Sequence, residues 1–177
     1  MSTCSIIEFR DGLAETAAEF GNAWGGAARI WNSLYNTYLK DPNSEYDSWV
    51  SAFTRNNGEP LWQLREREDI PFFERVVLVG TFDKAILRRE NFSKFAGHLR
   101  EFVAKYPAPG ACHLNKWADF IEKSDAEAIA FHATSVSSSH WWIRDDDDDG
   151  RPYDLNRDND HFEVYDYFTA ADHFVKG

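Results

Sequence analysis

The residues best suited to chemistry in this sequence are the carboxylates that follow Arg144. Five consecutive aspartates precede Gly150 and give the pattern D-x-D-x-D-G. In the first half of an EF-hand loop, alternate carboxylates of this pattern face one cation, and Ca²⁺ prefers such oxygen ligands. Asp145, Asp147 and Asp149 are therefore the candidate metal ligands, and calcium is the candidate ion.

The second half of an EF-hand loop does not follow. Asn156 stands at the twelfth position, where a bidentate glutamate is needed, and Pro152 stands at the eighth. A calcium loop of another type stays open, because more oxygen ligands lie nearby in the sequence: Asp154, Asn156, Asp158, Asp160 and Glu163. With His161, the same carboxylates would also suit a metal-dependent enzyme.

Other catalytic signatures are missing from the sequence. No G-x-S-x-G, H-E-x-x-H or C-x-x-C pattern occurs. Cys112 and His113 are neighbours in the chain, which by itself gives no nucleophile and base geometry. The sequence therefore favours binding over catalysis and predicts no catalytic residue and no cofactor other than a possible calcium ion.

Charge limits the classes of partner. The chain has 30 acidic and 19 basic residues and a net charge of −11. From Arg144 onward there are 11 acidic and 4 basic residues, so this end carries most of the excess. Such a charge repels nucleic acid and anionic membranes and attracts basic proteins. We call residues 144–160 the acidic segment and predict that it either docks on a basic partner, binds a cation or is simply a solvated loop.

Strict mimicry of DNA fits less well than a general acidic docking surface. Five extended aspartates cover at most ~17 Å, a length over which B-DNA shows about ten charges. Carboxylates elsewhere, such as Glu66, Glu68 and Asp69, would have to complete the imitation.

Two tryptophans precede the acidic segment. If residues 137–143 form a strand, Trp141 and Trp142 point to opposite faces, so one is buried and the other partly exposed. An exposed tryptophan flanked by carboxylates can anchor a basic partner, although shelter of the loop is an equal alternative. The predicted partner-binding residues are Trp141, Trp142, Asp145, Asp146, Asp147, Asp148, Asp149, Asp158 and Asp160.

The elements that must position these residues follow from hydrophobic periodicity. Amphipathic patterns predict helices over 27–38, 46–53, 91–106 and 114–121, with a short helical piece after Pro60. Extended patterns predict strands over 5–10, 76–79, 127–136, 137–143 and 161–168. The stretch 13–26 is ambiguous: 13–20 suits a helix, which glycines at 21, 25 and 26 then break. The expected fold is one α+β domain over 1–177, with a mainly antiparallel sheet formed by strands from both chain ends and several amphipathic helices packed on it.

The cysteines and the lengths of the apolar runs indicate the cellular compartment of the protein. Cys4 and Cys112 lie far apart, which indicates neither a disulfide framework nor a zinc ribbon. The amino-terminal residues show no targeting pattern, and no apolar run approaches the ~18 residues needed to span a bilayer. We expect a cytoplasmic protein that does not bind membranes.

Residues 19–35, EFGNAWGGAARIWNSLY, resemble a motif of small phage and prophage proteins of unassigned function. The resemblance covers 17 of the 177 residues and assigns no activity to any of them. It implies a phage-encoded inhibitor or counter-defence protein. Together with the charge, it leads to the hypothesis of a non-catalytic acidic protein that docks on a basic, nucleic-acid-binding surface of a host protein.

Overall fold

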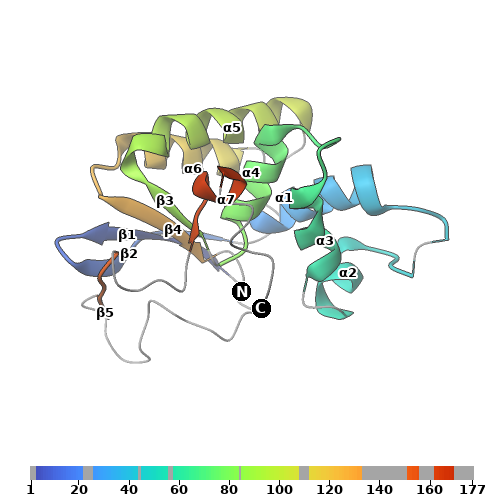
Figure 1. The fold of residues 1–177 in the computed structure, drawn as a ribbon, viewed down its shortest axis with the longest axis horizontal. Coiled ribbons are helices and arrows are strands. Elements are labelled where there is room, and N and C mark those ends of the chain that lie inside the picture. Colours follow the sequence, from blue (N-terminus) through green and yellow to red (C-terminus); the bar gives the residue numbers. More distant parts are fainter. Residues whose placement is uncertain are drawn as a thin grey trace.

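A computed structural model gives the α+β fold that the sequence predicts (Figure 1). It describes residues 3–21, 26–43, 45–55, 58–83, 85–107, 112–132, 151–155 and 162–169. Within these ranges one six-stranded sheet has the strand order β5-β2-β1-β4-β3-β6. The strands are β1 (Thr3–Arg10), β2 (Leu13–Gly21), β3 (Ala85–Arg88), β4 (Ala128–His132), β5 (Arg151–Pro152) and β6 (Phe162–Glu163).

The hairpin of β1 and β2 corrects the helix expected over 13–20. Asp11 and Gly12 have φ values of 50° and 78°, the left-handed conformation of a two-residue hairpin turn whose twist matches that of the flanking strands. The chain therefore folds straight back on β1 and pairs Phe9 with Ala14 and Ile6 with Ala18. The register shifts between Ile6 and Ile7, so Ala17 has no residue opposite it. This bulge breaks the period of two by which the strand would have been recognised.

Strands from the two halves of the chain meet at the centre of the sheet. β4 lies antiparallel between β1 and β3, and all five of its side chains are buried. β3 is only four residues long, and the sequence analysis missed it. β6 adds to β3 in parallel as two residues, so the strand expected over 161–168 is confirmed only at its start; α7 (Asp166–Thr169) follows.

α5 (Phe92–Lys105) and α6 (Cys112–Lys123) run over one side of the sheet, and several other helices lie beyond one end of it (Figure 1). Both α5 and α6 were predicted. The helix expected over 27–38 is also confirmed, as α1 (Ala27–Leu34) followed by a π-helical turn, η1 (Tyr35–Leu39). The remaining helical pieces are α2 (Trp49–Arg55), α3 (Glu59–Trp62), η2 (Gln63–Glu66), α4 (Phe72–Gly80) and η3 (Arg89–Asn91).

Helix α4 corrects the strand expected over 76–79. All four residues of that run are buried, because the helix is enclosed on every side at this point. Periodicity cannot separate a buried helix from a buried strand, and here the short length of the run favoured the wrong one. Within the described ranges, every helix is too short or too polar to cross a membrane.

Each face of the sheet has its own apolar layer. On the side of the helices, Phe131 of β4 stacks between Phe95 and Trp117, with ring centroids 5.5 Å away in each case. On the opposite face lies a smaller cluster with Ile7, Phe9, Ile86, Ala128, Ala130 and Tyr153. The described residues just after the acidic aspartates thus pack on the face that α5 and α6 leave open.

Candidate functional site

Most residues of the predicted site lie outside the described ranges. These are Trp141, Trp142, Asp145, Asp146, Asp147, Asp148, Asp149, Asp158 and Asp160, together with Asn156 and His161. Of the remaining candidate ligands, Asp154 is exposed and Glu163 is half-buried in an ion pair, with its Oε1 2.6 Å from Nε of Arg88. Among the residues that the structure describes, no group of three His, Cys, Asp or Glu side chains could hold a metal ion.

The carboxylate of Glu163 lies between charged neighbours of opposite effect. Burial raises the pKa of its carboxyl group, the neighbouring Asp166 raises it further, and Arg88 opposes both. Nη2 of Arg88 also donates to the carbonyl oxygen of Leu155 at 3.3 Å. Arg88 of β3 therefore contacts described residues on both sides of the gap at 156–161.

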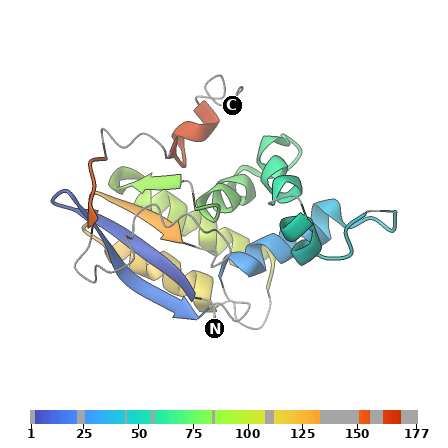
Figure 2. The ribbon, with the colours of Figure 1, turned by 90° about the horizontal axis from the view of Figure 1, so that it is seen from below.

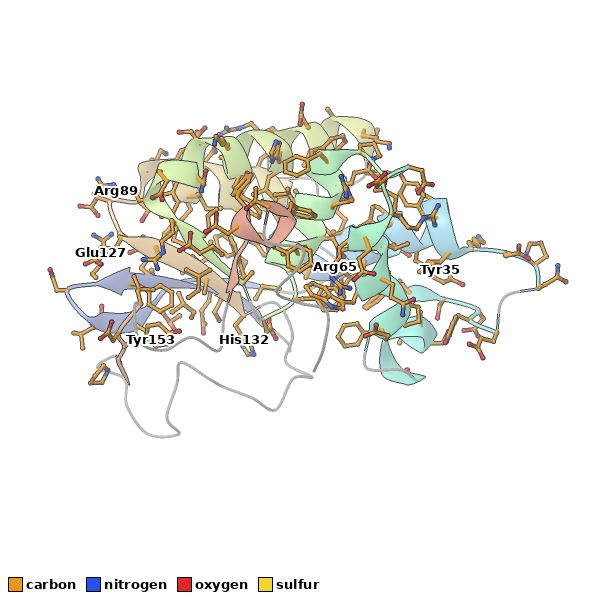
Figure 3. All side chains as sticks on the ribbon, viewed as in Figure 1. Tyr35, Arg65, Arg89, Glu127, His132 and Tyr153 are labelled. Atoms are coloured by element: carbon orange, nitrogen blue, oxygen red, sulfur yellow. The ribbon has the colours of Figure 1, made fainter. Side chains whose placement is uncertain are left out.

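The residues that follow the aspartate run are attached to the other edge of the sheet. The amide of Tyr153 donates to the carbonyl oxygen of Gly12 at 2.8 Å, and its ring centroid lies 4.8 Å from that of Phe9. In Figure 3 the labelled Tyr153 lies below the strands, away from α5 and α6. The acidic end of the chain is thus tied to β2 through β5 and to β3 through β6, which are the two ends of the strand order.

The outer edge of β2 is a second candidate surface. β5 pairs with Leu13 and Ala14 alone, so on the side away from β1 no strand of the described part of the chain lies beside Glu15 to Gly21. Figure 2 shows β2 along the border of the sheet. Glu15 and Glu19 are both exposed on this edge, and neither belongs to an ion pair of the described residues.

The group that most resembles catalytic machinery surrounds Glu74 of α4. Its side chain is 0% exposed and accepts hydrogen bonds from the hydroxyls of Tyr38 at 3.0 Å and Tyr106 at 2.8 Å. Nζ of Lys105 forms an ion pair with it and also donates to the Tyr38 hydroxyl at 3.3 Å. One carboxylate therefore joins η1, α4 and α5.

The electrostatics of this group favour a structural role. Burial, together with the carboxylate of Glu74, raises the pKa of Tyr106 to about 12, so the phenol keeps its proton. Burial lowers the pKa of Lys105, but its bonds to Glu74 and Tyr38 outweigh this and leave the pKa raised. A general base needs access to a substrate and spare acceptor capacity. Glu74 has three donors and no exposure, so we call this group the Glu74 clamp.

An aromatic surface lies where α4, α5 and α7 meet. Phe72 is 43% exposed, and its ring centroid lies 5.1 Å from that of Phe168 and 5.8 Å from that of His98. Nδ1 of His98 lies 3.0 Å from the hydroxyl of Tyr165, and burial lowers the pKa of this histidine. Arg75 lies over the rings of Phe72 and Phe168. The surface mixes cations with aromatic rings, so it does not suit a basic partner.

Two further features carry no chemistry of their own. A shallow hollow of about 280 Å³ is lined by Leu39, Pro60, Gln63, Leu64, Glu66 and Arg67. Both of its charged side chains are engaged in ion pairs, Glu66 with Arg65 and Arg67 with Asp69. Cys4 has a buried thiol whose pKa is raised to about 11 by burial, so at neutral pH it is protonated and a poor nucleophile.

Comparison with known proteins adds no relative: no protein-family model, curated protein or solved structure matches the chain. Function must therefore be argued from the residues and their geometry. Sequence reasoning missed the β2 edge because residues 13–20 read as a helix, although the Asp11-Gly12 turn directly after a strand was the available signal. It also missed the Glu74 clamp, since nothing in the sequence places Glu74 near Tyr38 and Lys105.

Proposed function

We propose that this chain is a non-catalytic binding protein whose acidic segment docks on a basic surface of another protein. The observation that carries the proposal is the separation of charge: 11 acidic and 4 basic residues from Arg144 onward, in a chain whose net charge is −11. A field concentrated on one part of a surface accelerates encounter with a partner of opposite charge and fixes its orientation.

Two described residues that follow the aspartate run contact the sheet, which supports docking through this part of the chain. Tyr153, within the acidic segment, packs on Phe9, and Glu163, just after the segment, pairs with Arg88. A chain attached to the sheet close to its charged residues loses less conformational entropy on binding than a free tail of the same charge. This arrangement favours a defined docking surface over general attraction.

The partner that suits this charge is a nucleic-acid-binding protein, because such proteins present basic faces for phosphates. The resemblance of residues 19–35 to phage and prophage proteins supports a host protein as the target and the host cytoplasm as the place of action. The chain would then act as an inhibitor by occupying the basic face in place of nucleic acid. Nucleic acid itself is not the partner, since two strongly negative molecules repel one another.

The test compares two variants with the same net charge. In the first, Asp145 to Asp149 are all changed to Asn. In the matched control, five exposed glutamates that form no ion pair among the described residues are changed to Gln: Glu59, Glu68, Glu90, Glu101 and Glu127. Each immobilised protein is exposed to host lysate at low and at high salt, and the captured proteins are identified by mass spectrometry.

We expect the wild type to capture basic proteins at low salt and to release them as salt shortens the range of the charges, with a Debye length of ~8 Å at physiological ionic strength. The five-aspartate variant should lose at least about tenfold of this capture, within the range known for electrostatic steering, and the control variant much less. Equal losses in both variants would mean that only total charge matters. Undiminished capture by the five-aspartate variant would place the interface elsewhere.

A further inference from the structure

The outer edge of β2 has the properties of a site for an added strand. Alternate residues of an edge strand point their amide and carbonyl groups away from the sheet, where another chain can pair with them. β5 already uses this side at Leu13 and Ala14, and the edge continues for seven residues, from Glu15 to Gly21. The edge contains no proline, so every residue keeps its amide donor.

The charge of this edge selects what pairs with it. Glu15 and Glu19 are exposed, and Glu15 lies opposite Glu8 of β1, whose carboxylate already pairs with Arg10 of the same strand. A second copy of the chain that paired antiparallel with this edge would bring its own Glu15 and Glu19 against these two, and like charges across a strand pair are unfavourable. The aspartates of the acidic segment have the same sign and suit the edge equally poorly. Opposite charge across the pair is favourable, so the edge fits a basic strand.

The bulge at Ala17 determines how far apart two basic residues of such a strand must be to face Glu15 and Glu19. Glu15 pairs with Glu8, whose carboxylate contacts Ser124 at the end of α6, so Glu15 lies on the helix side of the sheet. Glu19 pairs with Ser5, which lies between the helix-side residues Cys4 and Ile6 in β1 and therefore faces the opposite side. The two carboxylates are four residues apart yet lie on opposite faces. In a regular strand, two residues lie on opposite faces only when an odd number of positions separates them. A regular partner strand therefore meets Glu15 and Glu19 with residues three positions apart, as β1 does with Glu8 and Ser5, and Ala17 is left without a residue opposite it.

We propose that the β2 edge binds an extended basic segment of a partner protein by strand addition, with two basic residues three positions apart opposite Glu15 and Glu19. This inference rests on the proposed function, because it takes the same class of partner, and it adds a second contact beside the β5 attachment of the acidic segment. The backbone pairing supplies affinity, and the two carboxylates on opposite faces supply register.

The experiment uses two capped synthetic peptides of the same composition and charge as probes. In TVTKVTKVT the lysines are three positions apart, and in TVTKVTVKT they are four apart and share one face. Hydrogen exchange of the backbone amides of the full chain is measured with each peptide, and dissociation constants are obtained from titration. General attraction to a negative protein treats the two peptides alike, whereas strand addition does not.

With the first peptide we expect slower exchange of amides within Glu15–Gly21 and a dissociation constant about twofold to fivefold lower than with the second, because the second peptide can form only one of the two opposite-charge cross-strand pairs. Changing Glu15 and Glu19 together to Gln should abolish the difference, while changing Glu90 and Glu101 to Gln should preserve it. Equal affinities without protection of β2 amides would overturn strand addition. That result would leave the docking proposal standing if the five-aspartate variant still lost its lysate partner.

Discussion

The carboxylate of Glu74 and those of Glu15 and Glu19 show two opposite uses of the same chemical group. Glu74 is completely buried, and it receives two hydroxyl donors and one ammonium group from neighbouring elements. Glu15 and Glu19 are exposed on an open strand edge and form no ion pair within the described residues. The charge of Glu74 therefore stabilises contacts within the chain, whereas the charges of Glu15 and Glu19 are available to a partner.

The donors around a carboxylate therefore say more about its role than its burial does. A buried acid that a substrate could reach would suggest catalysis, but Glu74 is 0% exposed and is surrounded by three donors of the chain itself. An exposed acid usually contributes little to stability, which makes Glu15 and Glu19 changeable without loss of the fold. This contrast can be tested by changing members of each group.

The largest effect is expected from Glu74→Gln. This change removes the ion pair with Lys105 and leaves a neutral amide among three donors, so the free energy of unfolding should fall by about 3 kcal/mol. The expected loss is near the lower end of the range for a broken buried ion pair, because the ammonium group of Lys105 can still reach water. Urea unfolding followed by circular dichroism measures it. Glu90→Gln, at an exposed carboxylate of η3, is the matched control and should change stability by less than about 0.5 kcal/mol.

A Glu74→Gln protein as stable as the control would show that the Glu74 clamp does not contribute to the stability of the fold. In that case the buried carboxylate would need another explanation, and a catalytic role would regain interest. A large loss of stability together with unchanged capture of the lysate partner would separate the two uses of carboxylates as proposed.

The next effect depends on alkaline pH. The pKa of Tyr106 is about 12 in the folded chain, because burial and Glu74 raise it, and about 10 in an unfolded one. Between these values the unfolded chain has released the proton that the folded chain keeps, so stability falls as pH rises from about 10 to about 12. The raised pKa of Lys105 acts in the same direction. Urea midpoints from pH 8 to 12 should show the decline.

Tyr106→Phe provides the check on that assignment. The variant should be less stable than the wild type at pH 8, because it lacks a hydrogen bond to a buried carboxylate, and its midpoint should depend less steeply on pH above 10. An unchanged slope in the variant would assign the alkaline loss to other groups.

The fold class and most helices were predictable from sequence because their signals are local. The stripe of α5 repeats at the helical period along 14 residues, and the fold confirms it. α4 was not predictable, since the run from Val76 to Val79 is apolar on all sides and its surroundings decide its conformation. β2 was mistaken for a helix because tertiary pairing with β1 overrides the helix propensity of alanine and glutamate.

The features of the candidate site also differ in whether the sequence alone predicts them. Charge separation is a property of composition and could be read from the sequence alone, so it carries the docking proposal without help from the fold. The Glu74 clamp joins residues separated by more than thirty positions, such as Tyr38 and Glu74, and only packing brings them together. The strand-addition site needed the register of β1 and β2, including the bulge that moves Glu19 to the face opposite Glu15.

A small effect of opposite sign is expected from Glu15→Gln. Glu15 lies directly opposite Glu8 in the hairpin, and like charges across a strand pair are unfavourable. Because Arg10 already pairs with Glu8, neutralising Glu15 should raise the free energy of unfolding by only a few tenths of a kcal/mol. Differential scanning calorimetry at low salt measures it, and added salt should shrink the gain by screening the repulsion. A loss of more than about 1 kcal/mol would show that Glu15 is part of the internal network after all.

The smallest effect is expected from divalent cations, and it tests whether the acidic segment binds a cation. A loop that selectively bound calcium through Asp145, Asp147 and Asp149 would raise the melting temperature at millimolar calcium, because the ion binds the folded chain better than the unfolded one. Magnesium would do less, since it demands octahedral geometry and sheds its water reluctantly. A docking surface offers carboxylates to a protein and has no such preference. We therefore expect thermal melts in calcium, magnesium and EDTA at equal ionic strength to coincide, and a rise specific to calcium would replace docking by cation binding as the role of these aspartates.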